Sequence, residues 1–161
     1  MLHEDRWTRA HPELLQLGRL VFDPAGSACS APEPEAESQD YGAHTLTIDG
    51  ASVRFRVARE TPKKIGQFVT FWKRIGDGPI QPFDVYDDID ALIVVTRAPD
   101  RFGYFEFPMH SLCDHGIVTV GGKEGKRAFR LYPPWDSPVN RTAVSAQNWQ
   151  LSYFTDLSDR T

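Results

Sequence analysis

Residues 61–90 combine side chains that can bind a polyanion with side chains that can hold a metal ion. Cations are interspersed with aromatic residues at the start of this segment, a loop rich in glycine and proline follows, and four aspartates come last: Asp84, Asp87, Asp88 and Asp90. Lysine and arginine contact phosphates when a firm scaffold carries them, and Mg²⁺ prefers carboxylate oxygens. The segment therefore favours a site for phosphates and, beside it, a site for a hard cation.

Two basic clusters supply the candidate phosphate contacts. Thr61 followed by Pro62 is typical of a helix start, so we expect a helix that ends near Arg74 and carries the first cluster. A solvated helix face would explain that cluster alone equally well, but a second basic, glycine-rich stretch after Gly121 favours binding. The candidate nucleic-acid-binding residues are Lys63, Lys64, Lys73, Arg74, Lys123, Lys126, Arg127 and Arg130, with Tyr132 and Trp135 as aromatic residues that can stack bases.

The aspartates indicate a metal site at one position. Asp90 precedes an apolar run, residues 91–95, that is typical of a central strand. Glu106 lies in the next predicted strand, so Asp90 and Glu106 are the candidate metal ligands. A solvated acidic turn explains the other aspartates, and no Cys/His spacing suits zinc. We expect no cofactor, with Mg²⁺ considered only if the protein is a nuclease.

Composition indicates one cytoplasmic domain with segregated charge. A chain of 161 residues buries about two-thirds of its unfolded surface in a single core. The formal net charge is -4, yet residues 54–74 contain seven Lys or Arg and one Glu, so a positive face is compatible with a negative total. Cys29 and Cys113 have neither metal-ligand nor disulfide spacing, and we expect free thiols. Because the sequence shows no signal peptide or membrane-spanning run, we expect a cytoplasmic location and no membrane partner.

Hydrophobic periodicity predicts an α+β fold with a mixed β-sheet flanked by helices. Asp49-Gly50 is the strongest hairpin signal, and the apolar run from Ala91 predicts a central strand. Residues 1–25 should contain an accessory helix, and residues 26–40 are polar enough to form a mobile loop. The expected strands are 44–48, 52–57, 91–97, 102–107, 117–120 and 128–132, and the expected helices are 12–22, 61–74, 108–116 and 140–157.

An ordered set of strings resembles the MepB-like family over nearly the whole chain from about residue 12 onward. The core of this family is similar to that of PD-(D/E)xK nucleases. The resemblance therefore implies a single MepB-like domain over residues 1–161 with a restriction-endonuclease-like fold. The strings are ESQDYGA (37–43), TPKKIGQFVTFWKR (61–74), GPIQPFD (78–84), FGYFEFP (102–108), GKEGKRAFRLYPPWD (122–136) and QNWQLSYF (147–154).

The resemblance also implies nucleic-acid binding by a nuclease-like fold whose catalytic motif is not retained. In PD-(D/E)xK nucleases a lysine follows the second acid by two residues, but here Pro108 takes that place after Glu106. Ile89 stands where the proline of the PD pair would be. We therefore predict a bacterial protein that binds single-stranded DNA or RNA in preference to duplex, with metal-dependent cleavage as the activity if it is an enzyme. A link to a stress or drug-resistance response is implied by the family alone.

Two alternatives stay open from the sequence. A Mg²⁺-dependent nuclease would keep both candidate ligands and use Lys123 or Lys126 in place of the missing lysine. A small-molecule or protein-binding module would instead use the loop of residues 78–84, with Trp135, to line a pocket. The oligomeric state is not predicted.

Overall fold

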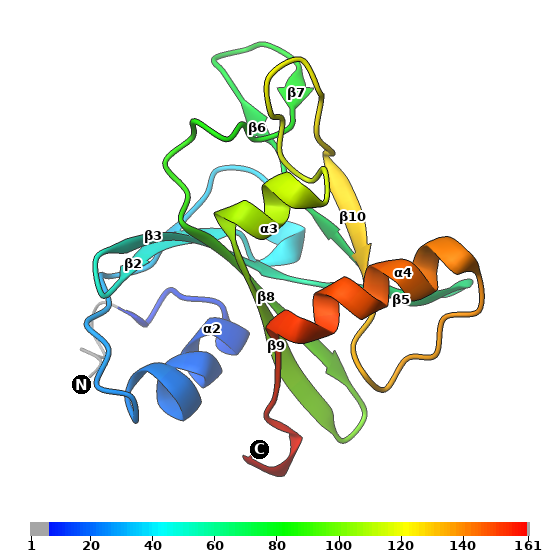
Figure 1. Cartoon of the computed structure of the whole chain (residues 1–161). Helices are drawn as coiled ribbons and strands as arrows, with labels where there is room; N and C mark the ends of the chain where they lie inside the picture. Colours follow the sequence, from blue (N-terminus) through cyan, green and yellow to red (C-terminus); the bar gives the residue numbers. More distant parts are fainter. Residues whose placement is uncertain (1–6, 161) are drawn as a thin grey trace.

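A six-stranded mixed sheet forms the centre of the fold (Figure 1). The computed structural model describes residues 7–160. β3 and β8 pair in parallel, and the other neighbours in this sheet pair antiparallel. The sheet and its flanking helices confirm the predicted α+β class. Across the sheet the strands are β1 (Glu33–Pro34), β2 (His44–Ile48), β3 (Ala51–Val57), β8 (Ala91–Ala98), β9 (Arg101–Pro108) and β11 (Phe154–Asp156).

The predicted hairpin between β2 and β3 is confirmed. Asp49 and Gly50 adopt φ values of 49° and 85°, and a two-residue turn with positive φ at both positions matches the twist of antiparallel strands. Ile48 accordingly lies opposite Ala51. Alternate residues of β3 lie on the same face of the sheet, so Arg54 and Arg56 share a face.

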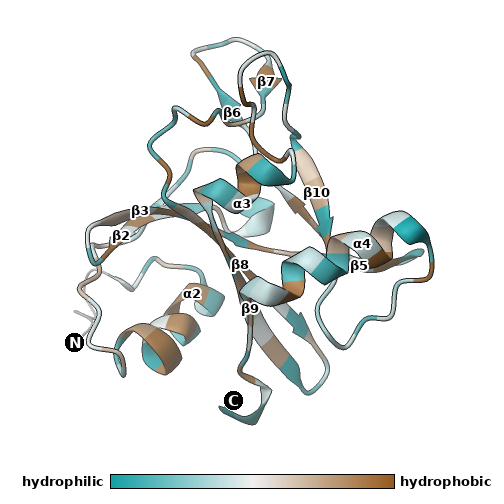
Figure 2. Cartoon of the chain, viewed as in Figure 1, coloured by the Kyte–Doolittle hydropathy of each residue, from teal (hydrophilic) through white to brown (hydrophobic). Residues whose placement is uncertain are grey.

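Both faces of β8 are buried, which explains its apolar sequence. Leu92 and Val94 join a core on one face, whereas Ile93 and Val95 join a second core on the other. Figure 2 shows β8 as a hydrophobic strand between the helices. The helices are α2 (Pro12–Leu17) with the π-helix Gly18–Phe22 on the side of Ile93, and α3 (Met109–Asp114) and α4 (Arg141–Gln150) on the side of Leu92.

The predicted helix over residues 61–74 is wrong, because this segment forms strands. Gln67 and Val69 are buried whereas Phe68 between them is partly exposed, which is the period of a strand. Pro62 lies in a turn, and Gly66 has a φ of 90° that an α-helix does not permit. The strands are β4 (Arg59–Thr61), β5 (Lys64–Thr70) and β6 (Lys73–Arg74); β5 pairs with β4 and with β10 (Ala128–Leu131), and β6 pairs with β7 (Ile80–Gln81).

Two other predicted elements, the strand over residues 117–120 and the C-terminal helix, differ in the structure. Residues 117–120 contribute isolated bridges and no strand. The C-terminal helix does begin after Asn140, whose side chain accepts the Ala143 N–H at 2.8 Å. It ends at Gln150, however, because the chain then turns through a 3-10 helix and pairs with β9 as β11.

The N-terminal segments pack against the main sheet. Residues 12–22 form α2 and the π-helix and bury apolar side chains in the second core, whereas residues 1–6 lie outside the described residues. Residues 26–40 carry β1 and part of the 3-10 helix Gln39–Tyr41, and their mobility stays a prediction. Cys29 and Cys113 are free thiols. Within residues 7–160, no helix is long and apolar enough to cross a membrane.

His11 caps α2 in a way that makes stability depend on pH. Its Nδ1 accepts the Glu13 N–H at 3.1 Å. Burial lowers the pKa of His11 from 6.5; His44 lowers it further, and Glu13 opposes this change. Because the folded pKa is depressed, the unfolded chain takes up the proton first as pH falls below about 6.5, so stability declines below that pH.

We expect His11→Asn to reduce this acid sensitivity, because asparagine can cap the helix without titrating. Thermal melts at about pH 7 and about pH 5 should show a smaller loss of Tm in the variant than in the wild type. Equal losses in the two proteins would contradict the role given to His11.

Candidate nucleic-acid interface

The cations of the first predicted cluster lie at opposite ends of β5. Lys63 is in the turn before the strand and Lys64 is its first residue, whereas Lys73 and Arg74 form β6 beyond its far end. A strand of this length spans about 20 Å. The single helical face expected from the sequence is therefore absent from this segment.

Several predicted cations are neutralised by carboxylates. Within residues 7–160, five of the predicted cations form no ion pair: Lys63, Lys64, Lys123, Lys126 and Arg130. A positive surface has to be sought among unpaired cations such as these five, because a paired cation contributes little net charge. The paired ones are Lys73 with Asp87 at 2.7 Å, Arg74 with Glu37 at 2.9 Å and Arg127 with Glu124 at 2.9 Å.

The outer face of the three-stranded sheet places an aromatic ring between two arginines. Phe68 on β5 lies opposite Arg59 on β4 and opposite Arg130 on β10. The Arg130 guanidinium is 5.8 Å from the centre of the Phe68 ring and donates to the Ile65 and Gly66 carbonyls. We call this surface the sheet platform; it consists of Arg59, Lys64, Phe68 and Arg130, with Tyr41 edge-on to Phe68 at 6.2 Å.

The acid of these strands lies on the opposite face. Glu60 pairs with Gln67, and Gln67 is buried, so cross-strand neighbours direct both side chains away from the platform. Burial raises the pKa of Asp136, and the nearby Glu60 carboxylate raises it further. Within residues 7–160, Arg59, Lys64 and Arg130 form no ion pair, so the platform keeps a positive charge.

A cavity of about 190 Å³ adjoins the platform between β10 and α4. Lys126, Arg130 and Tyr132, all predicted from the sequence, line it together. Trp149 and His115 also line the cavity, and their rings stack on each other with centroids 3.9 Å apart and an interplanar angle of 4°. Among residues 7–160, none of those that line this cavity is acidic.

Two tryptophans differ in their roles. Trp149 is partly buried and packs on Phe107 with ring centroids 5.3 Å apart, and it also lines the cavity. Trp135, expected to stack bases or to line a pocket with residues 78–84, is partly buried and packs edge-on against Phe154 at 5.6 Å. The structure thus places Trp135 in tertiary packing.

A second series of cavities is acidic. We call it the acidic groove; its first and second cavities share Arg54, and its second and third share Lys73 and Asp87. The volumes are about 440, 280 and 390 Å³. An excess of carboxylates repels a polyanion. The lining carboxylates are Glu33, Glu35, Glu37, Asp84, Asp87, Asp88 and Glu124, and the cations are Arg54, Arg56, Lys73 and Arg74.

The candidate metal ligands do not acquire a third partner. The Asp90 carboxylate accepts the Ser52 N–H at 2.8 Å. Glu106 lies opposite Ile93, whose side chain packs on the α2 side of the sheet. In the described part of the chain, no group of three or more His, Cys, Asp or Glu side chains could hold a metal ion.

The comparisons with known proteins agree with this fold. A family model described as MepB-like matches residues 35–156. The chain belongs to the MepB-like family. The crystal structure of MepB is similar to this MepB-like protein with a TM-score of 0.78 and 31% sequence identity, over 91% of this chain and 97% of that chain. No curated protein matches the chain. The predicted family is confirmed, whereas the restriction-endonuclease-like assignment stays a prediction.

Sequence reasoning did not include Arg59, Phe68 and Tyr41 among the candidate interface residues. Phe68 lay inside the helix expected over residues 61–74, and Arg59 lay outside it. The alternation of buried and exposed residues along β5 is the signal that could have found them. It places Phe68 on the opposite face from Val69, and it makes Arg59 a cross-strand neighbour of Phe68.

Proposed function

We propose that this MepB-like protein binds single-stranded nucleic acid in the cytoplasm, through the sheet platform and the adjoining cavity. The observation that carries the proposal is the position of Phe68 between Arg59 and Arg130, on a face that holds no acid of its own strands. An exposed aromatic ring on a sheet stacks an unpaired base, and flanking cations contact the phosphates on either side.

The geometry favours a single strand over a duplex. Phe68 can stack only on a base whose face is free, and paired bases in a duplex are stacked on their neighbours. Lys63 and Lys64 extend the positive charge along the hairpin from β4 to β5, and Lys126 extends it into the cavity. The path leads away from the acidic groove, where a polyanion would be repelled.

Binding without strand cleavage is the activity proposed. Pro108 follows Glu106 at the position where the PD-(D/E)xK pattern requires a lysine, and proline can neither donate a proton nor stabilise a developing charge. Asp90 uses its carboxylate to hold Ser52 at the start of β3. A structural role therefore explains Asp90 without a metal ion.

The double variant Arg59→Glu/Arg130→Glu should weaken binding of labelled single-stranded RNA or DNA by at least about tenfold and lower the salt slope by about 2. Fluorescence anisotropy across a salt series measures both quantities. Phe68→Ala should weaken binding with no change in the slope, because stacking releases no counterions.

A matched control is Arg9→Glu/Arg19→Glu, which makes the same change in net charge with exposed cations of the N-terminal segment. It should reduce affinity much less than the platform variant. The proposal fails if both double variants lose affinity equally, or if wild-type affinity does not fall as salt rises. Shortening of the probe on a gel would contradict the absence of cleavage.

A further inference from the structure

Two arginines of β3 meet in the middle cavity of the acidic groove. Arg54 and Arg56 are two residues apart on one strand and so share a face, and both line this cavity of about 280 Å³, which we call the arginine cavity. Aromatic rings hold the two guanidiniums: Arg54 lies 5.1 Å from the centre of Phe83 and Arg56 lies 5.6 Å from the centre of Phe71. Such support fixes the direction in which their N–H groups point.

One carboxylate, that of Glu35, accepts from both arginines. Arg54 donates to Glu35 at 2.8 Å, and Arg56 donates to both oxygens of the same carboxylate. The side chain of Arg56 is only 1% exposed, and burial lowers its pKa while Glu35 opposes this effect. Two guanidiniums share one negative charge, so the cavity keeps an excess positive charge where desolvation makes it costly.

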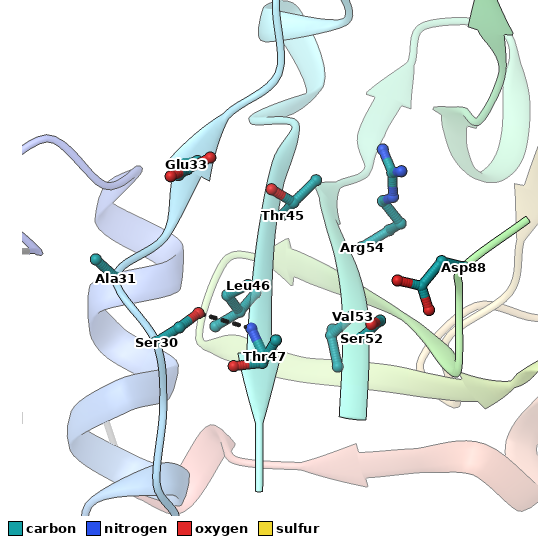
Figure 3. A pocket seen from close by; sticks show the side chains of 10 residues that line it. All are labelled: Ser30, Ala31, Glu33, Thr45, Leu46, Thr47, Ser52, Val53, Arg54 and Asp88. Atoms are coloured by element: carbon teal, nitrogen blue, oxygen red, sulfur yellow. Dashed lines mark hydrogen bonds between the residues drawn. The ribbon is translucent and has the colours of Figure 1, made fainter. Parts of the chain in front are cut away.

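Arg54 also has donors to spare. A guanidinium carries five N–H groups, and the protein acceptor found for Arg54 is Glu35. Arg54 lines the first cavity of the groove as well, where Thr45, Ser52 and Asp88 lie around it (Figure 3). Arg54 can therefore reach a ligand that enters from that side.

We propose that Arg54 and Arg56 form a binding site for a phosphomonoester group, and that Glu35 is an internal carboxylate that occupies the site until the ligand displaces it. A phosphomonoester carries about two negative charges at neutral pH and would neutralise both guanidiniums. Its oxygens also suit the forked geometry in which arginine donates.

Glu35 can leave without unfolding the sheet. It follows β1, an edge strand of two residues, and its side chain is 17% exposed, so a released carboxylate regains water. Its backbone is tied to the fold by the Glu35 N–H bond to Ala43 and by Gln39, which donates to the Glu35 carbonyl. A change of the Glu35 rotamer is therefore sufficient to open the site.

The surrounding acids limit the size of the ligand. Glu37 and Asp87 line the arginine cavity, paired with Arg74 and Lys73. Further carboxylates line the neighbouring cavities. A chain of phosphates would meet this repulsion along its length, whereas a small or terminal phosphate would not. The arginine cavity shares no lining residue with the sheet platform.

Titration with inorganic phosphate at constant ionic strength tests the proposal, with the fluorescence of Trp72, which lines the cavity, as the readout. Glu35→Gln should bind phosphate at least about tenfold more tightly than the wild type, because the competing charge is removed. Arg54→Gln should abolish the response. Asp114→Asn removes an exposed carboxylate of α3 that lines none of the three cavities of the groove, and it should leave the affinity within about twofold.

Equal affinity of the wild type and Glu35→Gln, or an equal response in Arg54→Gln, would overturn the proposal. If Glu35→Gln did not fold, the phosphate-induced rise in Tm of the wild type against that of Arg54→Gln would decide in its place. The phosphate group could belong to the end of a nucleic-acid strand or to a small ligand. Oligonucleotides with a 5′-phosphate or a 5′-hydroxyl, tested in the Arg59→Glu/Arg130→Glu background, separate these two sources. A gain from the 5′-phosphate that needs Arg54 identifies a strand end, and a response confined to free phosphate identifies a small ligand.

Discussion

Replacing Phe107 by alanine should lower the free energy of unfolding by about 3–5 kcal/mol. Phe107 is fully buried on β9 and contacts rings from three other parts of the chain. Its ring centroid is 5.3 Å from Phe105 and from Trp149, 5.9 Å from Tyr153 and 6.2 Å from Phe129. The substitution leaves a cavity where the main sheet, the three-stranded sheet and α4 meet, and elements that are each tied to a sheet cannot collapse to fill it.

Urea denaturation followed by tryptophan fluorescence measures this loss. Tyr86→Ala is the control, because it also removes an aromatic ring, but one that is 92% exposed, and surface changes stay within about 0.5 kcal/mol. A loss below about 1.5 kcal/mol for Phe107→Ala would show that this junction is not tightly packed. Because Trp149 packs on Phe107 and lines the cavity beside the platform, nucleic-acid affinity should fall as well.

Gly66→Ala should also destabilise the protein, by about 3 kcal/mol or more, through strain and a clash together. Gly66 has a φ of 90°, and a Cβ atom there would lie 2.7 Å from the Tyr132 ring and 2.8 Å from the Leu131 carbonyl oxygen. The backbone oxygen cannot move without breaking the pairing of β5 with β10. The Tyr132 ring would have to leave its place in the cavity wall, so binding of single strands should weaken too.

Gly50→Ala is a closely matched control for this variant. Gly50 has a φ of 85°, but nothing lies within 4 Å of a Cβ atom built on it. The two variants therefore carry similar conformational strain, and the difference between them reports the clash with β10. Equal unfolding free energies would contradict the close packing of Tyr132 on β5.

Local signals were sufficient for much of the fold. Asp49-Gly50 specifies its turn through the φ values that these two residues tolerate. The apolar run of β8 specifies a strand with two covered faces, and Asn140 starts α4 with its own side chain. Each of these depends on a few neighbouring residues, and so it can be predicted from sequence order alone.

The segment after Thr61 shows where such reasoning fails. Thr61-Pro62 is compatible with a helix start and equally with a turn between strands, since proline presets the same φ in both. Pairing with β10, more than fifty residues away in sequence, decides in favour of the strand. Gly66 accommodates Tyr132 only in that arrangement.

The sequence by itself determined the family, the mixed sheet with its hairpin and central strand, and the presence of two basic clusters. The tertiary structure alone decided which cations are unopposed. Lys73, Arg74 and Arg127 are paired with carboxylates from other elements, whereas Arg59 and Arg130 lie on either side of Phe68. The physical reason is that electrostatic interactions depend on distance in space and on burial. Strand pairing brings together residues that are far apart in sequence, so sequence order reveals neither their distance in space nor their burial.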